Sequence, residues 1–340
     1  MERTFEYMVS TQCFTYNQAP YIEDTLRGFA MQETSFPVVN IIVDDASTDK
    51  EPEVLRKWVH NNLLIDKGEE KWRILPYGEL AVGKLKKNIK STFVVLLLNE
   101  NHYQRGLKQK RLEYISEWKV NAKYHALCEG DDYWIHPMKL QCQVDFMESH
   151  PEYSMCFNNA LVTYDGMNKP ARIFNQIGKD QEIGLEQLID KWICPTPGIL
   201  MRSSILPLYT VKGSIISGDW RRTLHCAACG KVWAMKAVMS CYRKTGNETS
   251  LSNMVSHRSD ETFLKKVTIL EGLDDYTVGR YHNLIGKYIR YYKVFGSLIQ
   301  FKKRHGIIAT LIMRPFSVIE ILWKRYLRPK FNGKAPSFSA

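Results

Sequence analysis

The amino-acid sequence predicts an α/β protein in which a mostly parallel central sheet is covered by flanking helices, with a helical C-terminal extension. Over the first half of the chain, apolar runs of strand length alternate with helical periodicity, which is typical of parallel sheets. Acidic or polar turns follow these apolar runs, and the ligand sites of such sheets lie beyond the carboxyl ends of the strands. From about residue 261 onward the periodicity is helical only.

The individual elements follow from the spacing of the apolar residues. Strands are expected at residues 7–14, 36–43, 93–98, 124–127 and 156–163, and segment 195–201 is expected to be a loop that enters a strand. Helices are expected at residues 19–32, 51–62, 108–118 and 221–228. In the extension, helices are expected at residues 276–301 and 307–326, the second interrupted at Pro315.

The bulk composition is that of an ordinary globular protein. The chain has 340 residues, of which 44% are hydrophobic and 24% charged, and this excludes a disordered or fibrous chain. The length suggests about two domains. The formal net charge of +11 fits a partner that carries phosphate, which leaves open a nucleic acid, an anionic membrane face and a phosphorylated small molecule.

The sequence predicts a cytoplasmic location. Residues 1–5 lack a charged-then-apolar signal segment, so export is not expected, and no run approaches the roughly 20 apolar residues of a spanning helix. The eight cysteines are spread along the chain, which indicates reduced, packed thiols. A zinc site usually needs two Cys-x-x-Cys pairs, so the single pair Cys226 and Cys229 is expected to pack.

Two pairs of adjacent carboxylates follow expected strands. Asp131 and Asp132 come after the strand at 124–127, and hard divalent metals such as magnesium or manganese bridge such oxygens to substrate phosphates. An acidic helix cap explains the same pair. Asp44 and Asp45 either belong to a solvated, capped turn or accept hydrogen bonds from a nucleotide base or ribose. Asp219, before the helix at 221–228, is on its own a helix cap.

Four separated motifs, taken in order, resemble the family 2 inverting glycosyltransferases of GT-A fold, in particular the bacterial branch that builds surface polysaccharides. The motifs are Phe14–Asn17, Val43–Asp49, Asn101–Gly106 and Glu129–Trp134, the last followed by Pro137 and Lys139-Leu140. The resemblance covers roughly residues 6–245. It implies a GT-A catalytic domain at 1–260, with a nucleotide-binding half at 1–135 and an acceptor half at 136–260, and a basic helical extension at 261–340.

The resemblance implies a role in nucleotide binding for four residues. Phe14 and Tyr16 would border the nucleotide, with Tyr16 stacking near the base. Asp45 would accept a hydrogen bond from the imide of uracil or an equivalent base, and Asp44 would support that turn. Phe14 stands where the family often has a small hydroxyl residue.

Three further carboxylates take their expected roles from the same resemblance. Asp131 would lie by the ribose and sugar, Asp132 would ligate the divalent metal, and Asp219 would be the general base. Tyr242-Arg243 resembles a pair near the end of the family's catalytic domain, where Arg243 would meet a phosphate or form a structural ion pair.

The resemblance implies transfer of a sugar from a nucleotide-diphosphate donor, with uridine diphosphate as the expected nucleotide, to a glycan or lipid-linked acceptor. A catalytically inactive GT-A-like binding protein and a nucleotidyltransferase are the alternatives. A nucleic-acid partner is not expected, because carboxylates at the strand ends would repel a phosphate backbone.

The last forty residues have the composition of a basic amphipathic helix. Nine lysines and arginines between residues 301 and 340 accompany a single acid, Glu320, and apolar residues are interleaved with them. This pattern is typical of a helix that lies on an anionic membrane, here the inner face of the cell membrane. A helix packed on the catalytic domain with a solvated basic face explains it equally.

Overall fold

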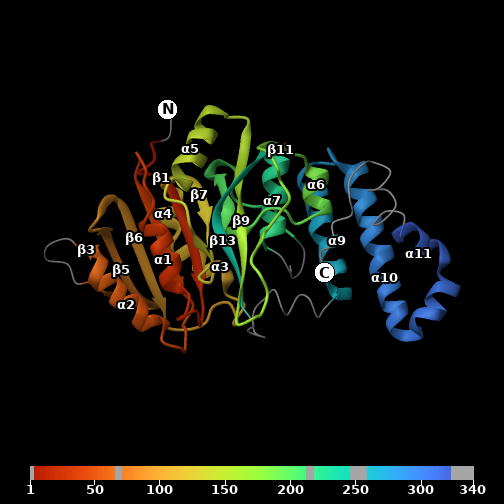
Figure 1. Cartoon of the computed structure of the whole chain (residues 1–340), viewed down its shortest axis with the longest axis horizontal. Coiled ribbons are helices and arrows are strands. Elements are labelled where there is room, and N and C mark those ends of the chain that lie inside the picture. Colours follow the sequence, from red (N-terminus) through yellow and green to blue (C-terminus); the bar gives the residue numbers. More distant parts are fainter. Residues whose placement is uncertain (1–3, 66–70, 212–217, 246–258, 323–340) are drawn as a thin grey trace. The chain divides into compact units, whose positions relative to one another are not determined.

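The computed structural model describes residues 4–65, 71–211, 218–245 and 259–322. The chain forms two compact units, the first made of residues 1–207 and 226–246 and the second of residues 208–225 and 247–340 (Figure 1). The large sheet and its flanking helices confirm the predicted α/β class. The predicted domain boundary at residue 260 stays a prediction.

The first unit is built on one mixed sheet with the strand order β11-β13-β9-β12-β7-β1-β2-β6-β5-β3. Four neighbouring strands pair in parallel: β7 (Ala122–Leu127), β1 (Tyr7–Thr15), β2 (Val38–Asp44) and β6 (Asn88–Leu98). The other strands on this path are β3 (Leu63–Leu64), β5 (Gly78–Leu85), β9 (Tyr153–Asp165), β11 (Gln181–Ile183), β12 (Ile199–Arg202) and β13 (Lys231–Thr245). Short strands β4 (Arg73–Leu75), β8 (Tyr133–Trp134) and β10 (Arg172–Ile173) pair at its margins. A second parallel pair is formed by β9 and β13.

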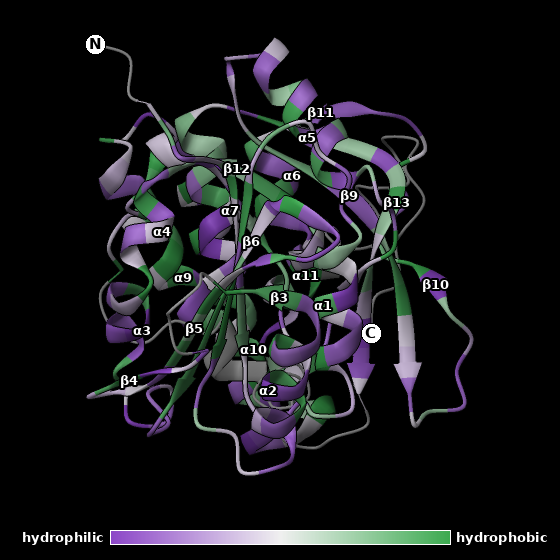
Figure 2. Cartoon of the chain, turned by 90° about the vertical axis from the view of Figure 1, so that its left-hand side faces the viewer, coloured by the Kyte–Doolittle hydropathy of each residue, from purple (hydrophilic) through white to green (hydrophobic). Residues whose placement is uncertain are grey.

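Helix α1 (Ile22–Ala30) buries one apolar stripe. Ile22, Leu26 and Phe29 of this stripe are buried, and Met31, just after the helix, is partly buried. The other helices are α2 (Glu51–Asn62), α3 (Lys108–Tyr114), α4 (Ser116–Val120), α5 (Lys139–Ser149) and α6 (Leu185–Asp190), with short 3-10 turns at Thr196–Gly198 and Ser203–Ile205. Figure 2 shows the resulting polarity, with apolar strands inside and polar helix surfaces outside.

Two elements of the first unit differ from the expectation. The strand expected at 93–98 begins at Asn88 and pairs antiparallel with β5, a strand that the apolar pattern did not reveal. The helix expected at 108–118 is divided into α3 and α4 at Ile115, whose side chain is fully buried. Both differences depend on tertiary contacts. Strand β5 has a hydrogen-bonding partner only because β6 lies beside it, and the burial of Ile115 holds the chain in the non-helical conformation that separates α3 from α4.

The second unit is helical. Helix α7 (Gly218–Cys229) contributes its first eight residues, followed by α9 (Ser259–Tyr276), α10 (His282–Met313) and α11 (Pro315–Leu322), and α9 and α10 lie side by side (Figure 1). The predicted interruption at Pro315 is confirmed. Helix α10 also kinks at Gly306, where φ is 81°. The remainder of the helix expected at 307–326, beyond residue 322, lies outside the described residues. Among the described residues, no helix is long and apolar enough to cross a membrane.

Candidate functional site

The carboxyl ends of the parallel strands bring the predicted nucleotide residues to one edge of the sheet. Thr15 at the end of β1 stands next to Asp44 at the end of β2, and the Asp45 amide donates to the Thr15 carbonyl over 3.0 Å. On the other side of β1, the Cys128 amide after β7 donates to the Gln12 carbonyl over 3.2 Å. The turns after β1, β2 and β7 therefore adjoin one another.

The acidic turn at 129–132 is fixed against β1 and α1. Its closing hydrogen bond runs from the Asp132 amide to the Glu129 carbonyl, 3.0 Å away. The hydroxyl of Thr25 in α1 lies 3.0 Å from the Gly130 carbonyl and 2.6 Å from that of Asp132. Gly130 packs so closely that a Cβ there would lie 2.2 Å from Oγ1 of Thr15. Only glycine permits this approach of the turn to the strand end.

Asp132 is a fully buried carboxylate with one oxygen in need of a partner. Its Oδ1 accepts a 2.8 Å hydrogen bond from the Arg243 amide in β13, while Oδ2 has no hydrogen-bond partner among the described residues. Burial raises the pKa of Asp132 well above its usual value, and the charges of Asp131 and Glu129 raise it further. A buried carboxylate in this setting is stabilised by a proton or by a cation.

Asp131 is only partly buried and lies beside a positive charge. Burial raises the pKa of its carboxyl group, and both the charge of Arg243 and a hydrogen bond with Gln18 oppose that rise. Asp131 is thus the more accessible of the two adjacent acids, and Asp132 is the one that the fold encloses.

The carboxylates of this turn fit a divalent metal that a substrate completes. Among the described residues, no group of three or more His, Cys, Asp and Glu side chains is arranged to hold a metal by itself. Magnesium is typically bound through one or two carboxylates together with substrate phosphates. Asp131 and the unpartnered oxygen of Asp132 are oxygen donors of the kind that such an arrangement uses.

Asp44 belongs to a buried network of acids and hydroxyl groups. The Ser47 hydroxyl lies between the carboxylates of Asp44 and Glu51, and has one proton to donate between the two. Glu51, at the start of α2, also accepts from the Thr15 hydroxyl and, over 2.7 Å, from the Gln18 amide. Burial raises the pKa of Asp44 to about 6 and that of Glu51 to about 7. This network ties the ends of β1 and β2 to α2.

Asp45 holds the segment that follows β6. Its carboxylate accepts hydrogen bonds from the amides of His102 and Tyr103, at 2.8 and 2.9 Å, and from the Arg111 guanidinium at 3.0 Å. A carboxylate offers about four lone-pair sites, so about one is left for a ligand. The Asn101–Gly106 motif is therefore positioned by Asp45 itself.

Phe14 and Tyr16 flank Thr15 and are both half-buried. The Phe14 ring packs in an apolar cluster, and the Arg111 guanidinium carbon lies 4.4 Å from its centre. Beside this cluster lies a cavity of about 380 Å³, in which Tyr77 and Tyr114 stack with ring centres 3.7 Å apart. None of the predicted site residues lines this cavity within the described part of the chain.

Asp219 lies in the second unit, in the first turn of α7. It is half-buried, and its Oδ1 is 2.7 Å from the Arg222 guanidinium. The structure thus gathers Phe14, Asp44, Asp45, Asp131 and Asp132 in the first unit, together with the neighbouring Tyr16. The general-base role of Asp219 stays a prediction.

Three charged groups of the site were missed by sequence reasoning. Glu51 stands in the first turn of α2, where an acid is ordinarily interpreted as favourable to the helix dipole. Arg111 is one of several cations in α3. Asp24 forms the 2.7 Å ion pair with Arg243, which bears out the structural ion pair among the two interpretations of Arg243. The Arg243 guanidinium also lies over the rings of Tyr21 and Tyr133.

Comparison with protein families and curated proteins gives relatives of partial length. Residues 14–74 match the family described as Glycosyl transferase family 2. The uncharacterized proteins Mb1547 of Mycobacterium bovis and Rv1520 of Mycobacterium tuberculosis are each 30% identical over 237 residues, which is 69% of this chain and 58% of each relative. The chain therefore spans less than two thirds of the length of these relatives.

A solved structure shares the fold. The crystal structure of S. aureus TarS 1-349 aligns with a TM-score of 0.50 and 14% identity, covering 88% of this chain and 92% of that one. The mannosyltransferase PcManGT from Pyrobaculum calidifontis, in complex with GDP-Man and Mn2+, aligns with a TM-score of 0.47 and 12% identity, covering 94% and 81%. Residues 14–74 of the chain thus match glycosyltransferase family 2, and the α/β sheet that contains them is a fold shared with TarS.

Proposed function

We propose that this chain is an inverting glycosyltransferase that moves a sugar from a nucleotide diphosphate, expected to be uridine diphosphate, to a hydroxyl group of a glycan or lipid-linked acceptor. We place this reaction in the synthesis of a bacterial surface polysaccharide. The observation that carries the proposal is the convergence of the turns after β1, β2 and β7, which puts Asp44, Asp45 and the acidic turn at one edge of the sheet. The family match over residues 14–74 begins in the same place.

In this proposal the first unit binds the donor. Tyr16 stacks near the base, Phe14 borders it, and Asp45 uses its remaining lone-pair site toward the base. Asp44 supports the turn through Ser47. Tyr103, whose amide bonds to Asp45, keeps the loop after β6 in place around the nucleotide.

Asp131 and Asp132 would hold a divalent cation, manganese or magnesium, with Asp131 also by the ribose. A bound cation neutralises the negative charge that grows on a departing nucleoside diphosphate. Asp219 would accept the proton of the acceptor hydroxyl group as that oxygen attacks the anomeric carbon, and the pair with Arg222 orients its carboxylate. A single displacement of this kind inverts the anomeric centre.

The Asp132→Asn variant tests the metal-binding role. Because asparagine removes a buried charge that lacks a full set of partners, we expect the variant to fold at least as stably as the wild type without metal. It should lose the rise in melting temperature that uridine diphosphate with manganese gives the wild type. The exposed Asp145→Asn variant should keep that rise. A wild-type protein that binds the nucleotide equally well without metal, or prefers triphosphates, would contradict the proposal.

The Asp219→Asn variant tests the general base. Loss of a general base slows the chemical step by roughly 10²–10⁴-fold, so transfer should fall by that factor. Donor binding, measured by calorimetry, should stay within about twofold because Asp219 does not touch the donor in this proposal. Asp275→Asn, an exposed acid of the same unit, serves as control. Transfer near the wild-type rate would remove Asp219 from the mechanism.

A further inference from the structure

The end of the second unit exposes a row of large aliphatic and aromatic side chains. Between the Gly306 kink in α10 and the end of α11, six of them are more than half exposed: Ile307, Ile308, Leu311, Ile312, Phe316 and Ile319. Phe316 is 85% exposed. Contiguous apolar surface of this kind marks an interaction site on a folded protein.

In the part of α10 that follows Gly306, the usual polarity of a surface helix is inverted. In the turns after Gly306 the buried side chain is Thr310, which is 4% exposed and whose hydroxyl donates to the Gly306 carbonyl over 2.7 Å. Ile308 and Ile312, which lie on the opposite face at helical spacing, are 71% and 72% exposed. A helix of a protein surrounded by water turns its apolar stripe inward. Such a face is suited to contact with an apolar phase rather than with water.

Positive charge accompanies the apolar face. Lys302, Lys303 and Arg304 precede the kink and Arg314 stands between the two helices, while Glu320 is the single acid in the described segment 301–322. A second copy of this chain would bring like charges together, and a neutral apolar protein surface would offer no complementary charge to these cations. An anionic lipid surface offers both an acyl layer for the isoleucines and headgroup phosphates for the cations.

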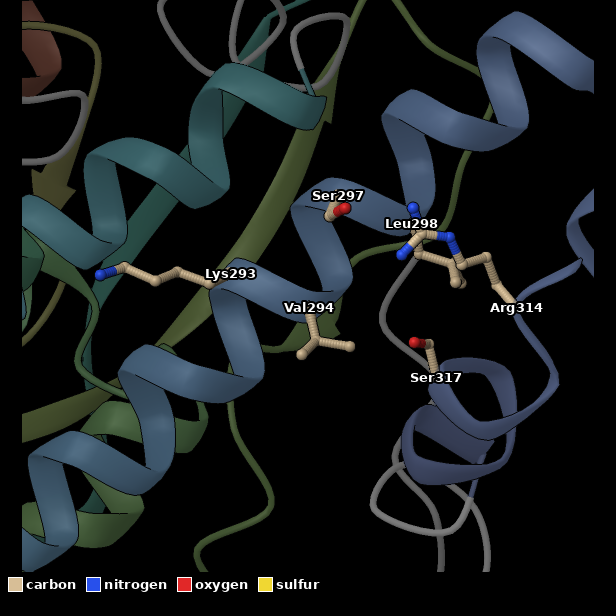
Figure 3. Close-up of a pocket in the computed structure, with 6 residues that line it drawn as sticks. All are labelled: Lys293, Val294, Ser297, Leu298, Arg314 and Ser317. Atoms are coloured by element: carbon tan, nitrogen blue, oxygen red, sulfur yellow. The ribbon is translucent and has the colours of Figure 1, made fainter.

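A cavity of about 260 Å³ between α10 and α11 carries groups suited to a phosphate. Figure 3 shows Arg314 and Ser317 from the α11 side and Ser297 from α10, whereas Lys293 points away. Lys293 is instead paired with Glu271 at 3.2 Å. The described residues that line the cavity include no acid, so it presents a guanidinium and hydroxyl groups to an anion.

We propose that residues 302–319 form a docking surface for an anionic lipid bilayer, with Ile308, Ile312 and Phe316 entering the acyl boundary and Arg314 meeting a headgroup phosphate. The proposal is independent of sugar transfer, because none of these residues belongs to the proposed donor site.

Co-sedimentation of the full chain with lipid vesicles tests this. The wild type should bind vesicles of phosphatidylcholine and phosphatidylglycerol more strongly than vesicles of phosphatidylcholine alone. The double variant Ile308→Ser/Ile312→Ser should lose at least about tenfold in affinity for the anionic vesicles, because it removes two aliphatic anchors. Arg314→Gln should weaken binding to anionic vesicles and leave binding to neutral ones unchanged.

The matched control is Ile74→Ser/Ile89→Ser, which changes two exposed isoleucines of the first unit. It should bind vesicles like the wild type, and circular dichroism should show all variants folded. Equal binding by the Ile308/Ile312 variant and the wild type, or no vesicle binding by the wild type, would overturn the proposal. So would analytical ultracentrifugation showing that the Ile308/Ile312 variant converts a dimer into a monomer, because the face would then join two copies.

Discussion

Glu51 is a carboxyl group that folding removes from water at the centre of the site. It is fully buried, and its oxygens accept from the Thr15 hydroxyl and the Gln18 amide. Burial outweighs these favourable hydrogen bonds and raises its pKa from 4.5 to about 7. Gln18 also bonds to Asp131, so Glu51 positions the residues next to the acidic turn without reaching the donor itself.

The pH dependence of stability should report this buried acid. Between pH 4.5 and 7 the folded protein holds a proton on Glu51 that the unfolded chain has lost, so stability is greatest below pH 4.5 and falls as the pH rises through 7. Glutamine does not titrate. The free energy of unfolding of the wild type, relative to Glu51→Gln, should therefore fall by about 3 kcal/mol across this window.

Urea denaturation of both proteins at several pH values measures this difference. Asp44, whose pKa is about 6, titrates in both proteins and cancels to first order. Glu53→Gln changes an exposed acid in the same helical turn and should run parallel to the wild type. Parallel curves for Glu51→Gln as well would show that Glu51 is ionised at low pH in the folded protein.

At the scale of elements, the contact between the acidic turn and β1 depends on a missing side chain. A Cβ on Gly130 would lie 2.2 Å from Oγ1 and 2.6 Å from Cβ of Thr15, and Thr15 is a buried, β-branched strand residue that cannot move aside. The turn therefore has to move if residue 130 gains a side chain, and Asp131 and Asp132 move with it.

Gly130→Ala should destabilise the fold by about 1–3 kcal/mol through overpacking. It should also weaken binding of uridine diphosphate with manganese, since the carboxylates no longer stand at the strand end. Gly178→Ala, where a Cβ meets open space, should change stability by less than about 0.5 kcal/mol. Denaturant unfolding and calorimetry measure the two effects. A Gly130→Ala protein with normal stability and nucleotide affinity would show that the turn is not held against β1.

Across the first unit, Arg243 joins segments that are far apart in the chain. It pairs with Asp24, 219 residues away, and its amide holds Asp132, 111 residues away. Its side chain is 7% exposed, whereas Arg27, which also approaches Asp24, is 73% exposed. The same acid thus has one enclosed and one solvated cationic partner.

We expect Arg243→Gln to lower the free energy of unfolding by about 2 kcal/mol, because it breaks an enclosed ion pair whose acid keeps some contact with water. Arg27→Gln should cost at most about 0.5 kcal/mol, since surface pairs contribute little. Urea denaturation compares the two variants. Equal losses of unfolding free energy in the two variants would mean that the Asp24–Arg243 pair between α1 and β13 stabilises the fold no more than a surface pair does.

The sequence by itself determined the α/β class, the bounds of α2 and the order of strands and acidic turns along the first half of the chain. These features arise from local periodicity and from the rule that parallel strands end at one edge. The motifs likewise named Asp44, Asp45, Asp131 and Asp132 among the residues that meet there, but not Glu51 or Arg111. The match of residues 14–74 confirms the family resemblance there, and the shared fold confirms the α/β class.

Only the tertiary structure decided which acid is enclosed. Asp132 and Asp131 are neighbours in sequence, yet Arg243 of β13 closes over one and leaves the other accessible. The carboxylate of Asp45 uses most of its hydrogen-bond acceptor sites to hold the segment that follows β6. In the helix after Gly306, the isoleucine side chains face outward. The hydrogen-bond partners of the Asp132 and Asp45 carboxylates lie 57 to 111 residues away in the sequence, so local residue spacing does not reveal them.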